Sequence, residues 1–267
     1  PRRGRHLLSR GRGEEFDEGT ERETRPLSSF AAATPILSSK KMRQLGIITA
    51  GCHVNHSGCI TDGKQYFAYC SNLAIYIFGL ETMRLEHIIA GYDKTITSID
   101  WNPFDSSQMV CTAMDQTVSI WNIEVEVTVE TLNLDVIAVM AVWCRLDPNL
   151  IAIVCEDNVV RLWSVKGRSS QVLRDFAHSN VRRLRWSPRV ASLLASGHED
   201  SSVVVYSTSS SRSRRFRCKD KELGGHSGGV LDLQWDPLSD TYLIVSFGGG
   251  SMALFDTEAH AMARTFD

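Results

Sequence analysis

Two cysteines and two histidines lie within eight residues, at Cys52, His53, His56 and Cys59. Thiolate sulfur and imidazole nitrogen are the usual ligands of tetrahedral zinc sites. However, an HxxH pair enclosed by two cysteines with six residues between them matches none of the common zinc spacings. The cluster also lies between two strand-like runs. We therefore expect no metal here, and the sequence predicts no cofactor elsewhere.

A second chemically distinctive stretch, residues 207–222, reads STSSSRSRRFRCKDKE. Its basic residues are Arg212, Arg214, Arg215, Arg217, Lys219 and Lys221. Basic side chains beside serines could form a phosphate-binding arm or a phosphorylatable loop. The alternative is a solvated insertion between two repeats. The sequence favours the insertion, because this stretch accounts for the one lengthened step of the repeat described below.

Recognisable catalytic motifs are absent from the sequence, which has no GxSxG, P-loop or HExxH and no GxGxxG between a strand and a helix. His198, Glu199 and Asp200 resemble a small acid–base cluster, but the repeat already explains Asp200 as a turn residue. Three further aspartates, Asp100, Asp232 and Asp236, flank tryptophans of the first strands and form no obvious catalytic pair. The sequence therefore predicts a protein that is not an enzyme.

The composition is that of a globular chain without a general affinity for polyanions. The 267 residues are 43% hydrophobic and carry a formal net charge of −2, which argues against a chain that coats nucleic acid along its length. Seven scattered cysteines without a CxxC pair suit reduced thiols, so we expect a cytoplasmic protein, with a nuclear location as the alternative. The longest apolar run, residues 136–143, is strand-sized, so no membrane insertion is expected.

Aromatic and turn residues recur at constant intervals along the chain. In four copies an aromatic residue precedes a turn residue by 14 positions, and a second aromatic follows that turn residue by 6. The copies are Trp101, Asp115 and Trp121; Trp143, Asp157 and Trp163; Trp186, Asp200 and Tyr206; and Trp235, Gly249 and Phe255. An earlier copy keeps only the second interval, from Asn72 to Phe78. The period of 42 or 43 residues, stretched once to 49, indicates a repeat architecture.

Short apolar runs separated by turn residues fill residues 46–267, without helical periodicity. They are rich in Val, Ile and aromatic residues and fall into groups of four, such as SIDW, QMVCTA, TVSIWNI and VTVETL. Residues 1–45 instead mix acidic and basic blocks with Gly, Ser and Pro, and offer too little apolar surface to offset the ordering entropy. The sequence therefore predicts an all-β array over 46–267 after a disordered N-terminal extension over 1–45.

The repeat resembles the WD40 β-propeller family over residues 46–267. The marks of that family are a Gly-His before the first strand, an Asp between the second and third strands, and a Trp-Asp that closes the third. His178 and His226 supply the histidine, and Trp121 and Trp163 supply the closing aromatic without its Asp. No copy is complete, but five copies keep one register. The resemblance implies about five four-stranded blades.

The resemblance also implies structural roles for the repeated polar residues. In blades of this family, the His, a Ser or Thr of the second strand and the turn Asp join the closing Trp in a hydrogen-bonded chain. His178, Ser196 and Asp200 occupy these places, with Tyr206 in the place of the Trp. Each net hydrogen bond of such a chain contributes about 0.5–1.5 kcal/mol. We therefore expect these positions to be structural.

One rim of the propeller is a common docking surface in WD40 proteins. Residues directly before the turn residues should lie near that rim, and Met114, Glu156 and Glu199 are therefore candidate partner contacts. For the two glutamates, ordinary exposed charge is an equally valid interpretation.

These observations favour a non-catalytic scaffold that mediates protein–protein interactions within a larger complex. The alternative is a propeller that binds nucleic acid or phosphate through its arginine-rich segments. Five visible repeats are fewer than the seven typical of the family, so we also expect a partial or open propeller. Open strand edges would promote aggregation of such an array.

Overall fold

The computed structural model describes residues 59–167, 169–173, 180–210, 212–217 and 228–266. Within these ranges the chain forms twenty β-strands and no helix, so the predicted all-β class is confirmed. The predicted N-terminal extension, the first residues of the predicted array (46–58) and most of the Cys/His cluster lie outside the described residues.

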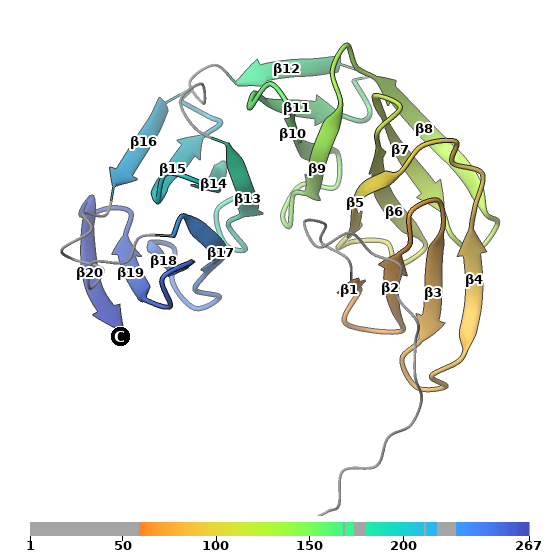
Figure 1. Ribbon diagram of the computed structural model, residues 1–267, viewed down its shortest axis with the longest axis horizontal. Coiled ribbons are helices and arrows are strands. Elements are labelled where there is room, and N and C mark those ends of the chain that lie inside the picture. Colours follow the sequence, from red (N-terminus) through yellow and green to blue (C-terminus); the bar gives the residue numbers. More distant parts are fainter. Residues whose placement is uncertain (1–58, 168, 174–179, 211, 218–227, 267) are drawn as a thin grey trace, which may run out of the picture. The chain divides into compact units, whose positions relative to one another are not determined.

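The strands form five antiparallel sheets, each made of four consecutive strands in chain order (Figure 1). Sheet 1 contains β1 (Cys59–Thr61), β2 (Tyr66–Cys70), β3 (Ile75–Gly79) and β4 (Leu85–Ile89). Sheet 2 contains β5 (Ile96–Trp101), β6 (Gln108–Ala113), β7 (Thr117–Asn122) and β8 (Val127–Asn133). Sheet 3 contains β9 (Ala138–Trp143), β10 (Leu150–Cys155), β11 (Val160–Ser164) and β12 (Ser169–Leu173). Sheet 4 contains β13 (Val181–Trp186), β14 (Leu193–His198), β15 (Ser202–Ser207) and β16 (Arg212–Arg217). Sheet 5 contains β17 (Val230–Trp235), β18 (Tyr242–Phe247), β19 (Met252–Asp256) and β20 (Ala261–Phe266). This arrangement is that of the blades of a WD40 β-propeller.

The register of the strands explains the constant intervals of the sequence. In sheet 3, Trp143 pairs with Ile151 and Ile151 pairs with Trp163, so the two aromatics flank one aliphatic residue in a row across three strands. Equivalent rows are Trp101, Met109 and Trp121; Trp186, Leu194 and Tyr206; and Trp235, Leu243 and Phe255. Directly paired residues point to the same face of a sheet. Each repeat therefore presents both aromatics to the same neighbour.

The hydrophobic core is divided into clusters that lie between successive sheets. Four clusters of buried residues are found in the described part of the chain, and each combines residues of two consecutive sheets. Trp143 and Trp163, for example, share a cluster with Val110 and Ile120 of sheet 2. No sheet encloses a core of its own, so each repeat depends on its neighbour for burial, as in other repeat proteins.

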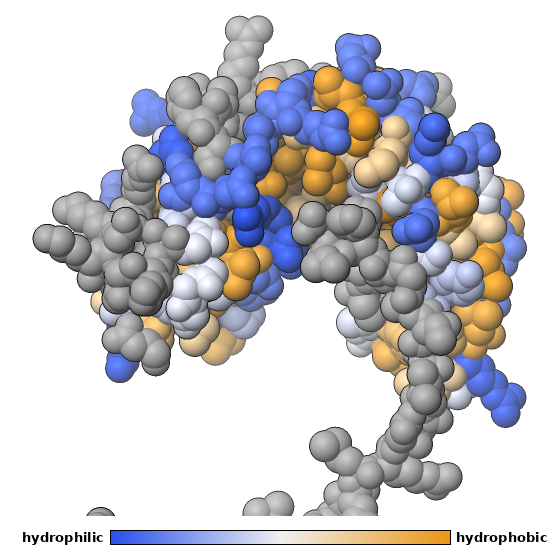
Figure 2. Space-filling view, viewed as in Figure 1, coloured by the Kyte–Doolittle hydropathy of each residue, from blue (hydrophilic) through white to orange (hydrophobic). Residues whose placement is uncertain are grey.

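The fourth strands carry apolar side chains that remain exposed. Leu85 and Ile88 of β4 and Val127 and Val129 of β8 are 42–52% exposed. Hydrophobic surface is accordingly visible at the right of Figure 2, where β4 and β8 run. The fourth strands of these two sheets therefore leave much of their apolar side-chain surface outside the hydrophobic core.

The prediction of a solvated insertion at residues 207–222 is wrong over most of its basic part. Residues Arg212–Arg217 form β16, which pairs along its whole length with β15. Phe216 opposes Val203, is buried, and packs against Phe255 of sheet 5 at 5.7 Å between ring centroids. A single buried aromatic and a complete ladder of backbone hydrogen bonds fix this strand, although its remaining side chains are mostly polar. Residues 218–222 lie outside the described residues.

Candidate partner-binding face

The turns between the second and third strands occupy equivalent positions in sheets 2 to 5. In each turn one backbone N–H donates to the carbonyl of the residue directly before the first strand of the same sheet, at 2.9 Å. The donor and acceptor pairs are Met114 and Thr95, Glu156 and Ile137, Glu199 and Asn180, and Gly248 and Gly229. Side chains at 114, 156 and 199 are exposed. We call these four turns, residues 114–116, 156–158, 199–201 and 248–250, the rim turns.

The turn carboxylates hold the rim turns in shape. Asp115, Asp157 and Asp200 each accept a hydrogen bond from the backbone N–H two residues later, at 3.0–3.2 Å. The intervening residue lies in the left-handed region, with φ between 60° and 68° at Gln116, Asn158 and Ser201. Gly250, with φ of 92°, takes this place in sheet 5. A short polar acceptor beside a left-handed residue is a stable turn geometry, so these aspartates act structurally.

Two of the turn aspartates also bind arginines on their own sheets. Asp157 receives two hydrogen bonds from Arg161, at 3.1 and 2.7 Å. Asp200 accepts from Arg215 of β16 at 2.7 Å. The hydrogen bonds from Arg161 lower the pKa of the Asp157 carboxyl below its ordinary value of 3.8. The carboxylate is therefore stabilised in its ionised form.

We expect Asp157→Asn to lower the free energy of unfolding by about 0.5–1 kcal/mol at pH 6 and to have a smaller effect at pH 3. A lowered folded-state pKa means that the stabilisation is present above 3.8 and is lost as the pH falls through the lowered value. Urea denaturation at both pH values measures this. The control is Asp115→Asn, because Asp115 has the same turn but no arginine partner in the described residues. An equal effect of Asp157→Asn at both pH values would contradict the argument.

The candidate contacts on the rim turns differ in how firmly they are held. The Glu199 carboxylate accepts from Arg182 at 2.6 Å and from Asn180 at 2.8 Å, and these hydrogen bonds lower its pKa. Glu156 is exposed and makes no recorded side-chain bond within the described ranges. Met114 is 44% exposed. The rim turns thus present one oriented carboxylate, one unconstrained carboxylate and one exposed thioether.

The histidine network implied by the family resemblance is only partly within the described residues, which exclude His178 and His226. Ser196 in β14 is buried, and its Oγ lies 2.8 Å from Nε2 of His198, which is also buried. Within the described residues, Asp200 accepts hydrogen bonds from Ser202 at 2.6 Å and from Arg215 at 2.7 Å. His198 is therefore a core residue of β14 rather than an exposed member of an acid–base cluster.

A buried carboxylate that the sequence did not reveal joins two sheets. Asp100 of β5 accepts from the backbone N–H of Trp143 at 2.7 Å and from Arg145 at 3.1 Å. Burial raises the pKa of the Asp100 carboxyl, and the nearby Arg145 opposes this rise. The bond crosses from sheet 2 to sheet 3, so Asp100 fixes how these first strands meet.

The tryptophans that end the first strands add further polar contacts. Trp186 donates from its indole nitrogen to the carbonyl of Val142 at 3.1 Å, and Trp235 donates to the carbonyl of Arg185 at 3.0 Å. Both bonds reach the first strand of the preceding sheet. The corresponding donors of Trp101 and Trp143 bind carbonyls of the following connection in their own sheet.

Metal ligands do not converge within the described residues, where no group of three or more His, Cys, Asp or Glu side chains could hold an ion. Of the predicted Cys/His cluster, only the backbone of Cys59 is described, at the start of β1. Cys111, Cys144 and Cys155 are buried and form no disulfide, and burial raises the pKa of all three thiols, that of Cys155 to about 11. These thiols are therefore protonated and shielded rather than nucleophilic.

The described ranges also contain no helix long and apolar enough to cross a bilayer.

Comparison with known families agrees with this architecture. Residues 83–122, which contain β4 of sheet 1 and β5, β6 and β7 of sheet 2, match the family model described as "WD domain, G-beta repeat". The chain carries a WD40 repeat. The matched WD40 repeat contains Trp101, Asp115 and Trp121, and the same intervals recur in sheets 3 to 5.

Several curated proteins are similar to parts of this WD40-repeat chain. "Component of gems protein 5" of Dictyostelium discoideum is 27% identical over 142 residues, covering 49% of this chain and 10% of that protein. "GATOR2 complex protein Wdr59" of Drosophila melanogaster is 27% identical over 150 residues, covering 54% and 15%. "Ribosome biogenesis protein WDR12 homolog" of Ixodes scapularis is 20% identical over 171 residues, covering 63% and 38%. The chain thus spans only a minor part of each relative.

Proposed function

We propose that this chain is a non-catalytic WD40 scaffold that mediates protein–protein interactions within a larger complex. The observation that carries the proposal is the set of rim turns, which the fold repeats in four sheets and which present exposed side chains at 114, 156 and 199. The repeated polar residues Asp115, Asp157 and Asp200 make structural hydrogen bonds, which leaves recognition to the side chains before them.

The names of the similar proteins support the same class of function. Two of the relatives are named as components of assemblies, the gems component and the GATOR2 complex protein. From these names we infer only that the present chain has protein partners. The buried free thiols are consistent with a cytoplasmic or nuclear location, which is part of the proposal.

Nucleic-acid or phosphate binding through the arginine-rich stretch has less support. A polyanion-binding arm needs several basic side chains that are free to meet phosphates. Arg215 is instead bound to Asp200 and Ser202, and the strand directs its neighbours to the opposite face. The described basic side chains of β16 therefore do not act as one patch.

A closer likeness within the WD40 proteins is also part of the proposal. The runs RQLGIITAGC, YFAYCSNLAIYIF, KTITSIDWNP and LQWDPLSDTYLIV resemble the start of WD repeat-containing protein seventeen. Members of that family are large, with further propeller repeats. The resemblance fits a role as one part of a multi-repeat scaffold.

Affinity capture tests the role of the rim turns. We expect the triple variant Met114→Ala, Glu156→Ala and Glu199→Gln, tagged and expressed in cells, to recover a bound partner about tenfold less than the unaltered chain does, because a few anchor residues dominate most interfaces. Glu199→Gln keeps hydrogen-bonding atoms for Arg182 and Asn180, so the turn should persist. Quantitative mass spectrometry of the captured proteins gives the ratio.

The control for this capture is the double variant Glu124→Gln and Val125→Ala, which alters exposed residues in the connection between β7 and β8. It should recover the partner at the level of the unaltered chain. Equal recovery by the triple variant would reject the rim turns as the docking surface.

A further inference from the structure

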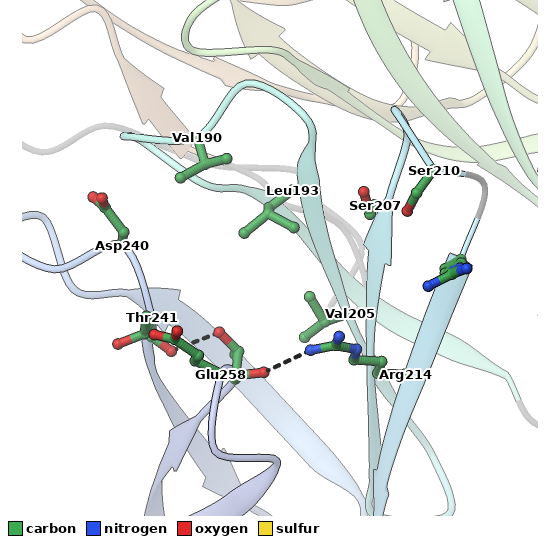
Figure 3. Close-up of a pocket in the computed structure, with 11 residues that line it drawn as sticks. Val190, Leu193, Val205, Ser207, Ser210, Arg214, Asp240, Thr241 and Glu258 are labelled. Atoms are coloured by element: carbon green, nitrogen blue, oxygen red, sulfur yellow. Dashed lines mark hydrogen bonds between the residues drawn. The ribbon is translucent and has the colours of Figure 1, made fainter.

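A groove lies between sheets 4 and 5, away from the rim turns. It is bounded by connections between first and second strands, by those between third and fourth strands, and by the inner face of β16 (Figure 3). Its volume is about 380 Å³, within the range of about 300–1,000 Å³ that is typical of ligand sites. Val190 and Leu193, both half-buried, and the buried Val205 supply its aliphatic lining.

Strand alternation places two arginines in this groove. Arg212 and Arg214 lie on the same face of β16 as Phe216, which packs against sheet 5. Arg215 lies on the other face and is held by Asp200. The groove is thus lined by Arg212 and Arg214, the described arginines of β16 that do not bind a carboxylate of the rim turns.

The charges of these two arginines are not neutralised by carboxylates in the described residues. Arg214 donates to the carbonyl of Thr257 at 3.4 Å and lies 3.2 Å from Nδ1 of His260. Arg212 is exposed and makes no recorded hydrogen bond or ion pair within the described ranges. Exposed guanidinium groups beside an aliphatic surface are well suited to bind a carboxylate or phosphate next to an apolar side chain.

The opposite wall of the groove is acidic, which restricts the kind of ligand. Asp240 is paired with Arg189, and Glu258 makes no recorded side-chain bond within the described residues. Both line the groove with the arginines (Figure 3). A nucleic-acid backbone would bring repeated negative charge against these carboxylates, whereas a peptide can place one acidic side chain at the arginines and a basic or neutral one at Glu258.

We propose that the groove between sheets 4 and 5 binds an extended peptide segment of a partner protein, with an acidic side chain at Arg212 and Arg214 and an aliphatic side chain against Val190 and Leu193. This is a second docking site that rests on the proposed scaffold function and names the chemistry that one partner must offer. The acidic group is a carboxylate or a phosphorylated hydroxyl, which share the same recognition by guanidinium.

Selection from a phage library of random nonapeptides on the purified 267-residue chain tests this site. We expect enriched peptides to carry Asp or Glu beside Val, Leu or Ile. Fluorescence anisotropy with the most enriched peptide should show about tenfold weaker binding to Arg212→Gln, because one charge-assisted hydrogen bond is lost. A phosphoserine version of that peptide distinguishes the two acidic groups. Arg84→Gln, an exposed arginine in the connection before β4, is the matched control and should bind normally.

Arg212→Gln should fold, since the side chain that it removes bonds to none of the described residues, and a thermal melt checks this. Glu258→Lys should in addition strengthen severalfold the binding of an enriched peptide that carries no basic residue. Enriched peptides that bind Arg212→Gln and Glu258→Lys as they bind the unaltered chain would overturn the groove while leaving the scaffold function intact. A failure to enrich any peptide would overturn the groove as a peptide site, whereas the scaffold function is decided separately by the affinity capture of the rim-turn variants. Binding of a labelled 20-nucleotide uridine RNA that is lost in Arg212→Gln, without an acidic consensus, would assign the groove to nucleic acid instead.

Discussion

Trp235→Ala is expected to lower the free energy of unfolding by about 3–5 kcal/mol, the cost typical of removing a large buried aromatic side chain. Trp235 is 1% exposed and lies in the core cluster that sheet 4 shares with sheet 5. Its indole also donates to the carbonyl of Arg185 in the preceding sheet. Removing the ring therefore opens a cavity between the two sheets and leaves a carbonyl without its donor. Urea denaturation monitored by circular dichroism measures the loss.

Trp235→Phe separates the two contributions. The phenyl ring keeps most of the packing but cannot donate to Arg185, so a loss of about 1–3 kcal/mol is expected. Leu238→Ala is the surface control, because Leu238 is 86% exposed and should change stability by less than about 0.5 kcal/mol. A Trp235→Ala chain as stable as the Leu238→Ala chain would contradict a shared core between sheets 4 and 5.

Asp100→Ala is expected to cost about 2 kcal/mol. The substitution leaves the buried N–H of Trp143 without an acceptor and Arg145 without its carboxylate. Two features limit the loss, since burial of a carboxylate is itself unfavourable and Arg145 is 44% exposed and can be hydrated. The same denaturation assay measures the effect.

Asp100→Asn provides the control for this contact, because its amide oxygen can still accept from Trp143. A smaller loss, of about 1 kcal/mol, is expected. If Asp100→Ala were as stable as the unaltered chain, the bond between β5 and β9 would not contribute to how sheets 2 and 3 meet.

The sheet arrangement could be predicted from the sequence because the constant intervals correspond to a row of paired residues across three strands of one sheet. Trp143 and Trp163 are 20 positions apart in the sequence, yet both flank Ile151 in adjacent strands. The interval is constant because two short antiparallel hairpins bring those residues into one row. The rim turns could be located in the same way, since Asp157 has a fixed place between the second and third strands. Which side chains of the rim turns contact a partner remains a prediction.

β16 was missed because a fourth strand need not look like a strand. It has one edge without a neighbour in its sheet and buries little, so RSRRFR shows only Phe216 as an apolar anchor. Its ladder with β15 is set by backbone hydrogen bonds, which leave no trace in residue type. A turn signal, the SSS stretch directly before it, followed by alternating residues would have been the available clue.

The role of Asp100 could not be derived either, because its partners lie 43 and 45 positions away in the next repeat. An acidic residue beside Trp101 reads as an ordinary polar position of a strand. The pairing depends on how two sheets pack, and periodicity within one sheet does not specify that. The groove between sheets 4 and 5 depends on the same packing.

Hydrogen–deuterium exchange of the chain, alone and bound to the partner recovered by capture, tests the scaffold proposal most directly. The proposal predicts slower exchange on binding in the rim turns, at residues 114–116, 156–158, 199–201 and 248–250. Unchanged exchange in all four rim turns, with protection confined to the exposed fourth strands β4 and β8, would contradict it.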